Sequence, residues 1–133
     1  ILPLFDYIHS LDNQKLAAKI SLEQIKKKFR PKIFIQVNVG NEIQKSGIEK
    51  KDLKLFYKLC LENYNLDIIG LMCIPPESTD SKIYFQEMLE LKKQLGLKEL
   101  SMGMSNDYIQ AVKNGATYIR IGSKIFGERT NRF

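Results

Sequence analysis

Short apolar runs alternate along this chain with segments in which apolar residues recur every three or four positions. The short runs are typical of buried strands, and the three-to-four spacing is typical of amphipathic helices. The predicted strands are residues 6–11, 32–39, 67–74, 99–104 and 118–121. The helices between them are predicted to begin at Asp12 or Asn13 and to cover residues 50–64, 81–95 and 106–114.

The ends of the predicted helices carry ordinary start and stop signals. Asp12 or Asn13 can cap the first helix, Pro31 ends it, and Gly96 and Gly115 follow the third and fourth. The predicted buried stripes are Leu16, Ala17, Ile20, Ile25 and Phe29 in the first helix, Leu53, Phe56, Tyr57, Cys60, Leu61 and Tyr64 in the second, and Phe85, Met88, Leu91, Lys92 and Leu95 in the third.

Strands that alternate with helices indicate parallel βαβ units, and strands that are apolar throughout indicate a sheet covered on both faces. Five such strands fit an open doubly wound sheet or an arc of a (β/α)₈ barrel, which takes about 250 residues when complete. Gln36 and Asn38 fall on one face of a buried strand, and Arg120 lies between two isoleucines. Polar groups on one strand face favour a barrel whose interior holds a ligand, with residues 1–133 as one domain.

Composition narrows the classes of protein. The chain has 133 residues, is 44% hydrophobic and carries a net charge of +6. The basic cluster at residues 26–32 is interpreted as a solvated helix end rather than a nucleic-acid patch, because no aromatic residues interleave with the charges as on a stacking platform. No apolar run reaches the roughly 18 residues of a membrane span. The start shows no signal-peptide pattern, and Ile1 in place of Met suggests a start further upstream.

Few residues are available for metal or nucleophilic chemistry. Cys60 and Cys73 are expected to be reduced core thiols, and His9 is the only histidine. We therefore expect no zinc site, no histidine-based catalysis, no nucleic-acid or membrane partner, and a cytoplasmic location.

Two strand ends carry candidate anion-binding residues. Ser105 follows the fourth predicted strand, and Gly122-Ser123 follows the fifth. Parallel neighbours place both turns at one edge of the sheet, where backbone N–H groups and the serine hydroxyl can bind a phosphate. Ser105 alone also fits a helix cap. Arg120 fits either an anion inside the barrel or a structural ion pair.

The same segments carry a family resemblance. Residues Ser101-Met-Gly-Met-Ser-Asn-Asp107 and Arg120-Ile-Gly-Ser-Lys-Ile-Phe-Gly-Glu-Arg129 resemble the C-terminal motifs of the YggS/PROSC family of pyridoxal phosphate homeostasis proteins, whose fold is the alanine racemase N-terminal barrel. The stretches 9–12, 35–38, 45–47 and 70–75 resemble further parts of that family in the same order. The resemblance implies a site for pyridoxal 5′-phosphate. It assigns the phosphate to Ser105, Gly122 and Ser123, the pyridine nitrogen to Arg120, and pocket walls to Met104 and Met72.

The resemblance also implies which part of the barrel is present. The family binds the cofactor through a lysine at the end of the first barrel strand, which has no counterpart here. The chain is then a partial barrel of approximately strands four to eight, with the Schiff-base lysine absent, and Lys45 does not match that lysine. An arginine opposite the pyridine nitrogen leaves that nitrogen unprotonated and the cofactor a weaker electron sink. This favours a carrier or buffer without catalysis, with pyridoxal-phosphate-dependent apoenzymes as its protein partners.

Three alternatives stay open. A racemase-like enzyme needs an opposing base, for which Tyr118 is the one tyrosine near the predicted site. A barrel that binds another phosphorylated metabolite needs no anchoring lysine. An inactive remnant is the third. Open barrel edges further predict marginal stability or self-association, because unpaired strand edges can pair with another chain.

Overall fold

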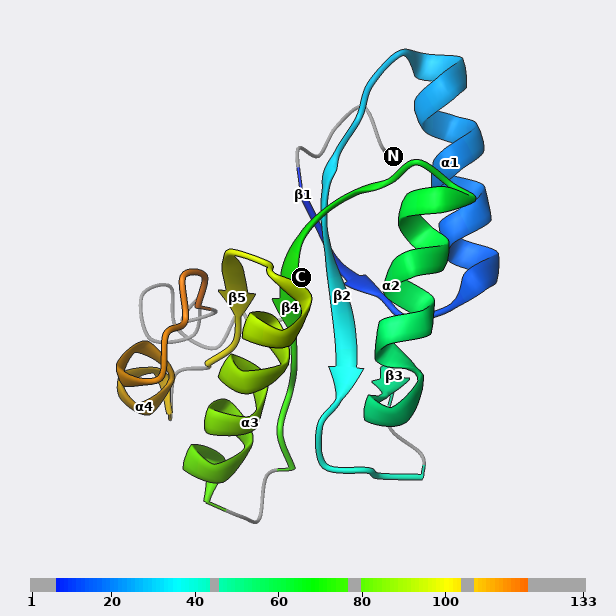
Figure 1. Ribbon diagram of the computed structural model, residues 1–133. Coiled ribbons are helices and arrows are strands. Elements are labelled where there is room, and N and C mark those ends of the chain that lie inside the picture. Colours follow the sequence, from blue (N-terminus) through cyan, green and yellow to red (C-terminus); the bar gives the residue numbers. More distant parts are fainter. Residues whose placement is uncertain (1–6, 44–45, 77–79, 104–106, 120–133) are drawn as a thin grey trace.

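A computed structural model describes residues 7–43, 46–76, 80–103 and 107–119 (Figure 1). Strands and helices alternate: β1 (Tyr7–Leu11), α1 (Gln14–Lys27), β2 (Lys32–Asn38), β3 (Ile48–Glu49), the 3₁₀ turn η2 (Lys50–Asp52), α2 (Leu53–Glu62), β4 (Asp67–Met72), α3 (Ser81–Leu95), β5 (Glu99–Ser101) and α4 (Tyr108–Lys113). The sheet order is β1-β2-β4-β5, with β3 pairing the end of β2, and all pairs are parallel. The predicted parallel α/β sheet is confirmed.

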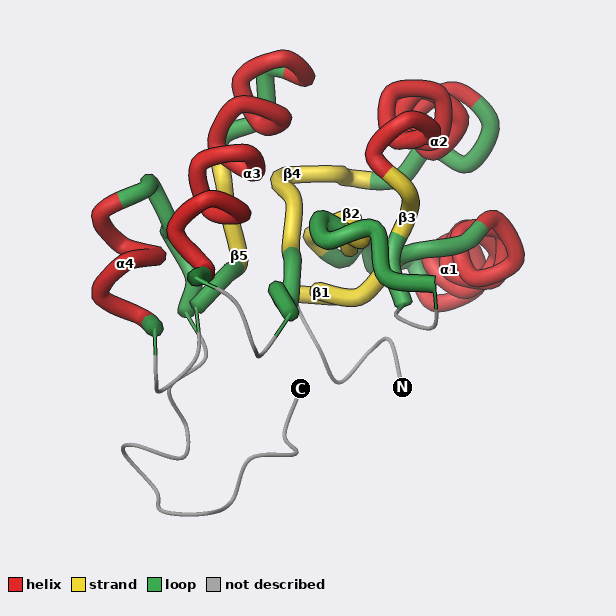
Figure 2. Tube along the Cα trace, turned by 90° about the horizontal axis from the view of Figure 1, so that it is seen from below, coloured by secondary structure: helices red, strands yellow, loops and turns green. Residues whose placement is uncertain are grey.

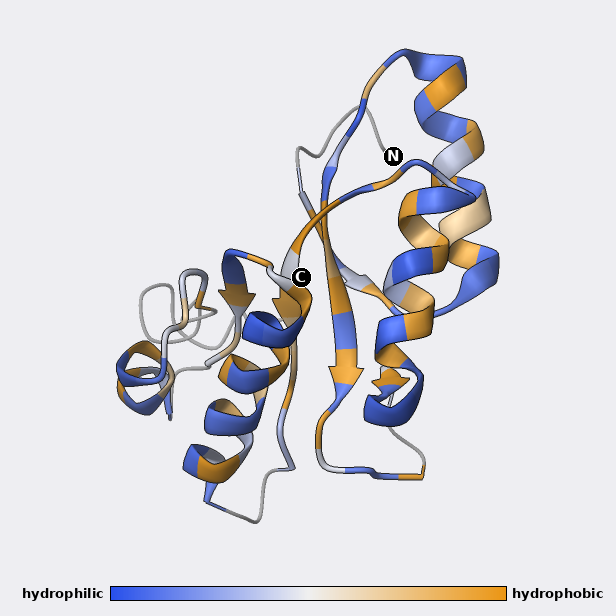
Figure 3. Ribbon diagram, in the orientation of Figure 1, coloured by the Kyte–Doolittle hydropathy of each residue, from blue (hydrophilic) through white to orange (hydrophobic). Residues whose placement is uncertain are grey.

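The core lies between one face of the sheet and the helices. Ile33, Ile35 and Val37 alternate along β2 and are almost fully buried, as are Leu71 on β4 and Leu100 on β5. The helices meet them with apolar side chains that recur at helical spacing, namely Ala17, Ile20, Leu53, Phe56, Cys60, Phe85 and Met88. In Figure 3, β4 and most of β2 are apolar, and the helices carry both polar and apolar residues. In the view from below, α1 lies beside α2, and α3 lies beside α4 (Figure 2).

The helix ends follow the predicted chemistry. The Asn13 side chain accepts a hydrogen bond from the Leu16 amide at 2.8 Å, which caps α1. Gly96 ends α3 in the left-handed conformation (φ 70°), where its amide donates to the carbonyls of Lys92 and Lys93. At the end of α1 the left-handed residue is Lys28 rather than a glycine.

Two predicted core positions are wrong. Ile25 is 70% exposed, because the buried stripe of α1 runs through Ala17, Ile20 and Gln24, and Ile25 lies a further 100° around the helix. Leu61 is likewise exposed, one position beyond the buried Cys60 of α2.

Several element ends also differ from the predictions. Residues 50–52 form a 3₁₀ turn before α2, and α4 covers six residues rather than nine. The two-residue strand β3 is too short to produce a periodic signal in the sequence. Within the predicted strand at residues 118–121, Tyr118 forms a parallel bridge with Ser101, and residues 120 and 121 lie outside the described part of the chain.

Candidate functional site

The second face of the sheet, here called the inner face, carries a different set of side chains. Gln36 on β2 is opposite Met72 on β4, and Met72 is opposite Ser101 on β5. Neighbours in a parallel ladder point to the same side, so these three residues form one row. The inner face is defined by Tyr7, His9, Phe34, Gln36, Asn38, Gly70, Met72, Ser101 and Tyr118. Phe34 and Met72 are buried here without belonging to the core cluster under the helices.

Aromatic rings fill the inner face at the level of Phe34. The His9 ring stacks on Phe34 with centroids 4.4 Å apart, and Tyr118 meets Phe34 edge-on at 5.1 Å. The ring centroids of Tyr118 and Tyr7 are 5.6 Å apart. Tyr7 belongs to the first strand of the sheet order, whereas Tyr118 follows β5 at the opposite end. The sheet is therefore strongly curved, because its two ends touch across the inner face.

Polar contacts reinforce this closure. His9 Nδ1 and Ser101 Oγ are 2.8 Å apart, which links β1 to β5 across the inner face. A hydrogen bond with Tyr7, with a smaller contribution from burial, raises the pKa of Tyr118 to about 12. The rings occupy the level of Phe34, and Gln36 and Met72 lie beyond them toward the carboxyl ends of the strands. In parallel α/β sheets this is the edge where ligands bind.

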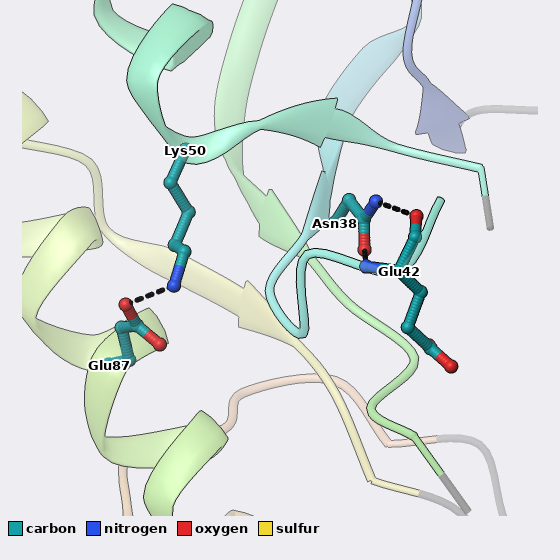
Figure 4. A network of polar contacts seen from close by, with 4 residues as sticks. All are labelled: Asn38, Glu42, Lys50 and Glu87. Atoms are coloured by element: carbon teal, nitrogen blue, oxygen red, sulfur yellow. Dashed lines mark hydrogen bonds and ion pairs between the residues drawn. The ribbon is translucent and has the colours of Figure 1, made fainter. Parts of the chain in front are cut away.

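Side chains at that edge hold the loop between β2 and β3. The Asn38 amide donates to the Glu42 carbonyl at 2.6 Å and accepts from the Glu42 amide at 3.1 Å (Figure 4). Asp12, at the end of β1, accepts from the Gly47 amide at 2.9 Å. A side chain at Gly47 would collide with the backbone of β2, and its φ of 118° favours glycine. Asn38 and Asp12 thus fix both ends of the loop that contains Lys45.

A second contact at this edge joins the starts of α3 and α4. The Ser81 hydroxyl donates to Asp107 Oδ2 at 3.0 Å. Asp107 therefore binds another helix instead of capping α4, for which it makes no side-chain cap. Ser81 and Asp107 are 26 residues apart in the sequence, so only the fold brings the two together.

Most of the predicted site residues lie outside the described part of the chain. These are Met104, Ser105, Arg120, Gly122 and Ser123, and their roles stay predictions. Met72 is described: it is 3% exposed and lies on the inner face near the carboxyl edge. The described residues on both sides of 104–106, Gly103 and Asp107, place this segment after β5 and before α4.

Gln36 is a residue whose individual role the sequence did not reveal, although its place on a polar strand face was predicted. Only 8% of Gln36 is exposed, and its amide forms no hydrogen bond within the residues that the structure describes. Its two polar neighbours on the inner face are engaged, Asn38 with Glu42 and Ser101 with His9. Periodicity can place such a residue on a face, but only coordinates show whether its amide has a partner.

Away from this edge, a cavity of about 350 Å³ lies between α2 and α3, lined by Lys50, Leu53, Lys54, Leu91, Gln94 and Leu95. Lys50 Nζ pairs with Glu87 Oε2 at 2.6 Å beside it (Figure 4). Pairing with Glu87 neutralises one of the cationic groups of the cavity, and none of the predicted site residues lines it. The carboxyl edge of the sheet is therefore the stronger candidate site.

The remaining chemistry of the described residues is sparse. Cys60 and Cys73 are buried free thiols, and burial raises the pKa of Cys60 to about 12. Among the described residues, three or more acidic, histidine or cysteine side chains do not gather into a metal-ligand set. In the same residues, no helix has both the length and the apolar character that crossing a bilayer requires.

The curved parallel sheet with a polar carboxyl edge defines a parallel α/β protein of the barrel class. Residues 4–130 match the family described as "Alanine racemase, N-terminal domain". The chain belongs to this family.

Its relatives share a consistent description. The chain is 41% identical over 131 residues to a "Pyridoxal phosphate homeostasis protein" of Aquifex aeolicus, covering 92% of this chain and 58% of that protein. A protein of the same name from Vibrio cholerae is 40% identical, with 94% and 56% covered. The chain thus spans less than two thirds of the length of these relatives.

Solved structures agree with the sequence comparison. The structure of PipY from Synechococcus elongatus without PLP has a TM-score of 0.84 at 33% identity, covering 95% of this chain and 63% of that one. The structure of PipY with PLP bound has a TM-score of 0.81 at 32% identity, with the same shares covered. The predicted family resemblance is confirmed.

Proposed function

We propose that this chain forms approximately strands four to eight of a barrel that binds pyridoxal 5′-phosphate and serves cytoplasmic cofactor homeostasis as a carrier rather than a catalyst. The observation that supports the proposal most is the likeness to PipY with PLP bound, which extends over 95% of this chain. The names of the relatives and their 56–58% coverage agree with it. The inner face fits the cofactor, because it offers to a flat polar ring the buried thioether of Met72 and the amide of Gln36, which has no hydrogen-bond partner among the described residues.

In this proposal the phosphate is held by Ser105, Gly122 and Ser123, and Arg120 faces the pyridine nitrogen. Met104 and Met72 form the walls beside the ring. The cofactor, when bound, supplies an aldehyde and an electron-poor ring. Because the six-residue helix α4 has a weak dipole, the hydroxyl and backbone N–H groups carry most of the phosphate attraction. The guanidinium of Arg120 is a very weak acid and does not transfer a proton to the ring nitrogen. The ring nitrogen then stays unprotonated, which disfavours carbanion chemistry.

Tyr118 supports a carrier over a racemase-like enzyme. It is the one tyrosine that the sequence suggested as an opposing base. Its pKa is raised to about 12, first by the hydrogen bond with Tyr7, so the phenol stays protonated at neutral pH. A protonated phenol held by another tyrosine is poorly suited to abstract a proton.

The proposal includes two kinds of partner. Pyridoxal-phosphate-dependent apoenzymes would receive the cofactor. Other copies of this chain would pair with open strand edges, since β1 and the Tyr118 segment each have one mapped strand neighbour in the described sheet. Sedimentation over a range of concentrations tests the second partner, and a monomer throughout would contradict it.

Binding by the phosphate group is the sharpest test. Pyridoxine 5′-phosphate is the preferred probe, because it lacks the aldehyde that reacts with surface lysines. Titration calorimetry should show that it binds at least about tenfold more tightly than pyridoxine, a difference typical of one charge-assisted contact. Ser105→Ala and Ser123→Ala should each reduce this preference. The exposed Ser10→Ala is the matched control and should leave it unchanged.

The second candidate, a barrel for another phosphorylated metabolite, is separated by the same titration. Glucose 6-phosphate that binds as tightly as pyridoxine 5′-phosphate would favour it, because the ring would then contribute nothing. Equal affinity for pyridoxine and its phosphate would refute both proposals.

A further inference from the structure

Gln36 lies at the centre of the inner face. It belongs to β2, which has β1 on one side and β4 on the other, and it shares a row with Met72 and Ser101. The aromatic rings of His9, Phe34 and Tyr118 fill the level below it. On the other side of this row lies the carboxyl edge, where Asn38 holds the next loop.

The amide of Gln36 is the exception among the polar groups near this row. Asn38 uses both ends of its amide on Glu42, and Ser101 is bonded to His9. Gln36 is more than nine-tenths buried and makes no side-chain hydrogen bond within the described residues. Among the fully buried side-chain nitrogen and oxygen atoms of the described residues, only Gln24 Oε1 lacks a partner, so the Gln36 amide keeps some access to solvent. An amide on a nearly buried residue that keeps such access and has no protein partner is available to a ligand.

We propose that Gln36 is a specificity-determining residue of the cofactor site and that its amide hydrogen-bonds to the 3-hydroxyl oxygen of the bound ring. This inference rests on the proposed function. There the phosphate belongs to the two loops and the ring nitrogen to Arg120, which leaves the ring oxygen without a protein partner. A carboxamide suits this oxygen in either protonation state, because it can both donate and accept.

The test is a cycle of two proteins and two ligands. Wild type and Gln36→Met are titrated with pyridoxine 5′-phosphate and with its 3-deoxy analogue, and inorganic phosphate is the reference. Methionine keeps the volume and removes the amide. We expect wild type to bind the parent compound about tenfold more tightly than the 3-deoxy analogue. Gln36→Met should bind the two alike, with its affinity for inorganic phosphate within about twofold of wild type.

Gln24 provides the matched control. It is also a glutamine with 8% exposure, but it lies on α1 on the helix side, where its Nε2 donates to the Asn65 carbonyl at 3.0 Å. Gln24 Oε1 is buried without a partner, so Gln24→Met removes one hydrogen bond and one unsatisfied oxygen together, and ligand binding rather than Tm is its readout. Gln24→Met should leave both ligand affinities unchanged. Gln36→Met should not lower the Tm of the ligand-free protein, because it removes an amide that has no protein partner among the described residues. Loss of ligand discrimination in Gln36→Met alone distinguishes a ligand contact from a general effect of removing a nearly buried glutamine amide.

The outcomes separate the two levels of inference. Equal parent-to-deoxy ratios in wild type and Gln36→Met would overturn the role of Gln36 while leaving the proposed function intact. A Tm for ligand-free Gln36→Met well below that of wild type would also overturn it, since Gln36 would then be structural. Wild type that binds pyridoxine 5′-phosphate no more tightly than inorganic phosphate would overturn the cofactor site and the Gln36 contact together.

Discussion

Replacing Ser101 by alanine tests the link that closes the inner face. Ser101 is fully buried, and its Oγ lies 2.8 Å from His9 Nδ1 on β1, 92 residues away in sequence. The alanine variant removes this partner from the imidazole. The contact is part-buried, because His9 keeps some exposure. Loss of such a hydrogen bond costs about 0.5–1.5 kcal/mol. We therefore expect the free energy of unfolding to fall by about 1 kcal/mol.

A double-mutant cycle isolates the contact. His9→Phe keeps a flat ring against Phe34 while it removes the ring nitrogens. If the hydrogen bond couples the two residues, the double variant should be more stable than the sum of the single effects by about 1 kcal/mol. Unfolding in urea is followed by circular dichroism, because the chain contains no tryptophan. Ser10 is an exposed serine on β1, the strand that carries His9. Ser10→Ala should change the free energy of unfolding by less than about 0.5 kcal/mol.

Additive effects would refute this account. A coupling energy near zero, within the ordinary additivity error of about 0.3–0.5 kcal/mol, would mean that His9 and Ser101 do not stabilise each other. The curvature of the sheet would then have to rest on the ring contacts and on the hydrogen bond between Tyr7 and Tyr118.

Further predictions concern single groups. Cys60, with its pKa raised to about 12 by burial, should react with iodoacetamide at pH 8 at least about a hundredfold more slowly than in urea, as peptide mass spectrometry can show; equal rates would contradict this. The fold favours the neutral Tyr118 phenol, so its stabilisation is complete below pH 10 and is lost as pH rises toward 12; tyrosinate absorbance should show a lower pKa in Tyr7→Phe, and an unchanged titration would contradict it. Asn38→Ala should lower the free energy of unfolding in urea by about 1–3 kcal/mol, because two hydrogen bonds to the Glu42 backbone are lost. An effect below about 0.5 kcal/mol would contradict the role of Asn38 in holding the loop between β2 and β3.

The sequence predicted the elements that local rules determine. Asn13 and Gly96 end helices through short-range hydrogen bonds, and residues 81–95 were located correctly because cap, period and stop signal agree. The predicted burial of Ile25 was wrong because several apolar residues compete for one helix face, and only packing against the sheet selects among them. Strand β3 was not predicted because two residues are too few to show a periodic pattern.

The site divides along the same line. The alternation of Gln36 and Asn38 with apolar residues predicted a polar strand face, and both are buried on the inner face. The hydrogen bonds His9–Ser101 and Ser81–Asp107 join residues from different βα units, so no local sequence pattern predicts them. Ser105, Arg120, Gly122 and Ser123 rest on the motif resemblance, and their positions lie outside the described residues.

The most direct test of the central claim is a residue-resolved NMR titration of the labelled chain with pyridoxine 5′-phosphate. We expect amide shifts to concentrate in residues 101–107 and 118–123, and beside Gln36 and Met72 at the carboxyl edge of the sheet. We expect little change around the cavity between α2 and α3. Shifts confined to Lys50, Lys54 and Gln94, or no saturable shifts at all, would contradict the claim that this edge holds the cofactor.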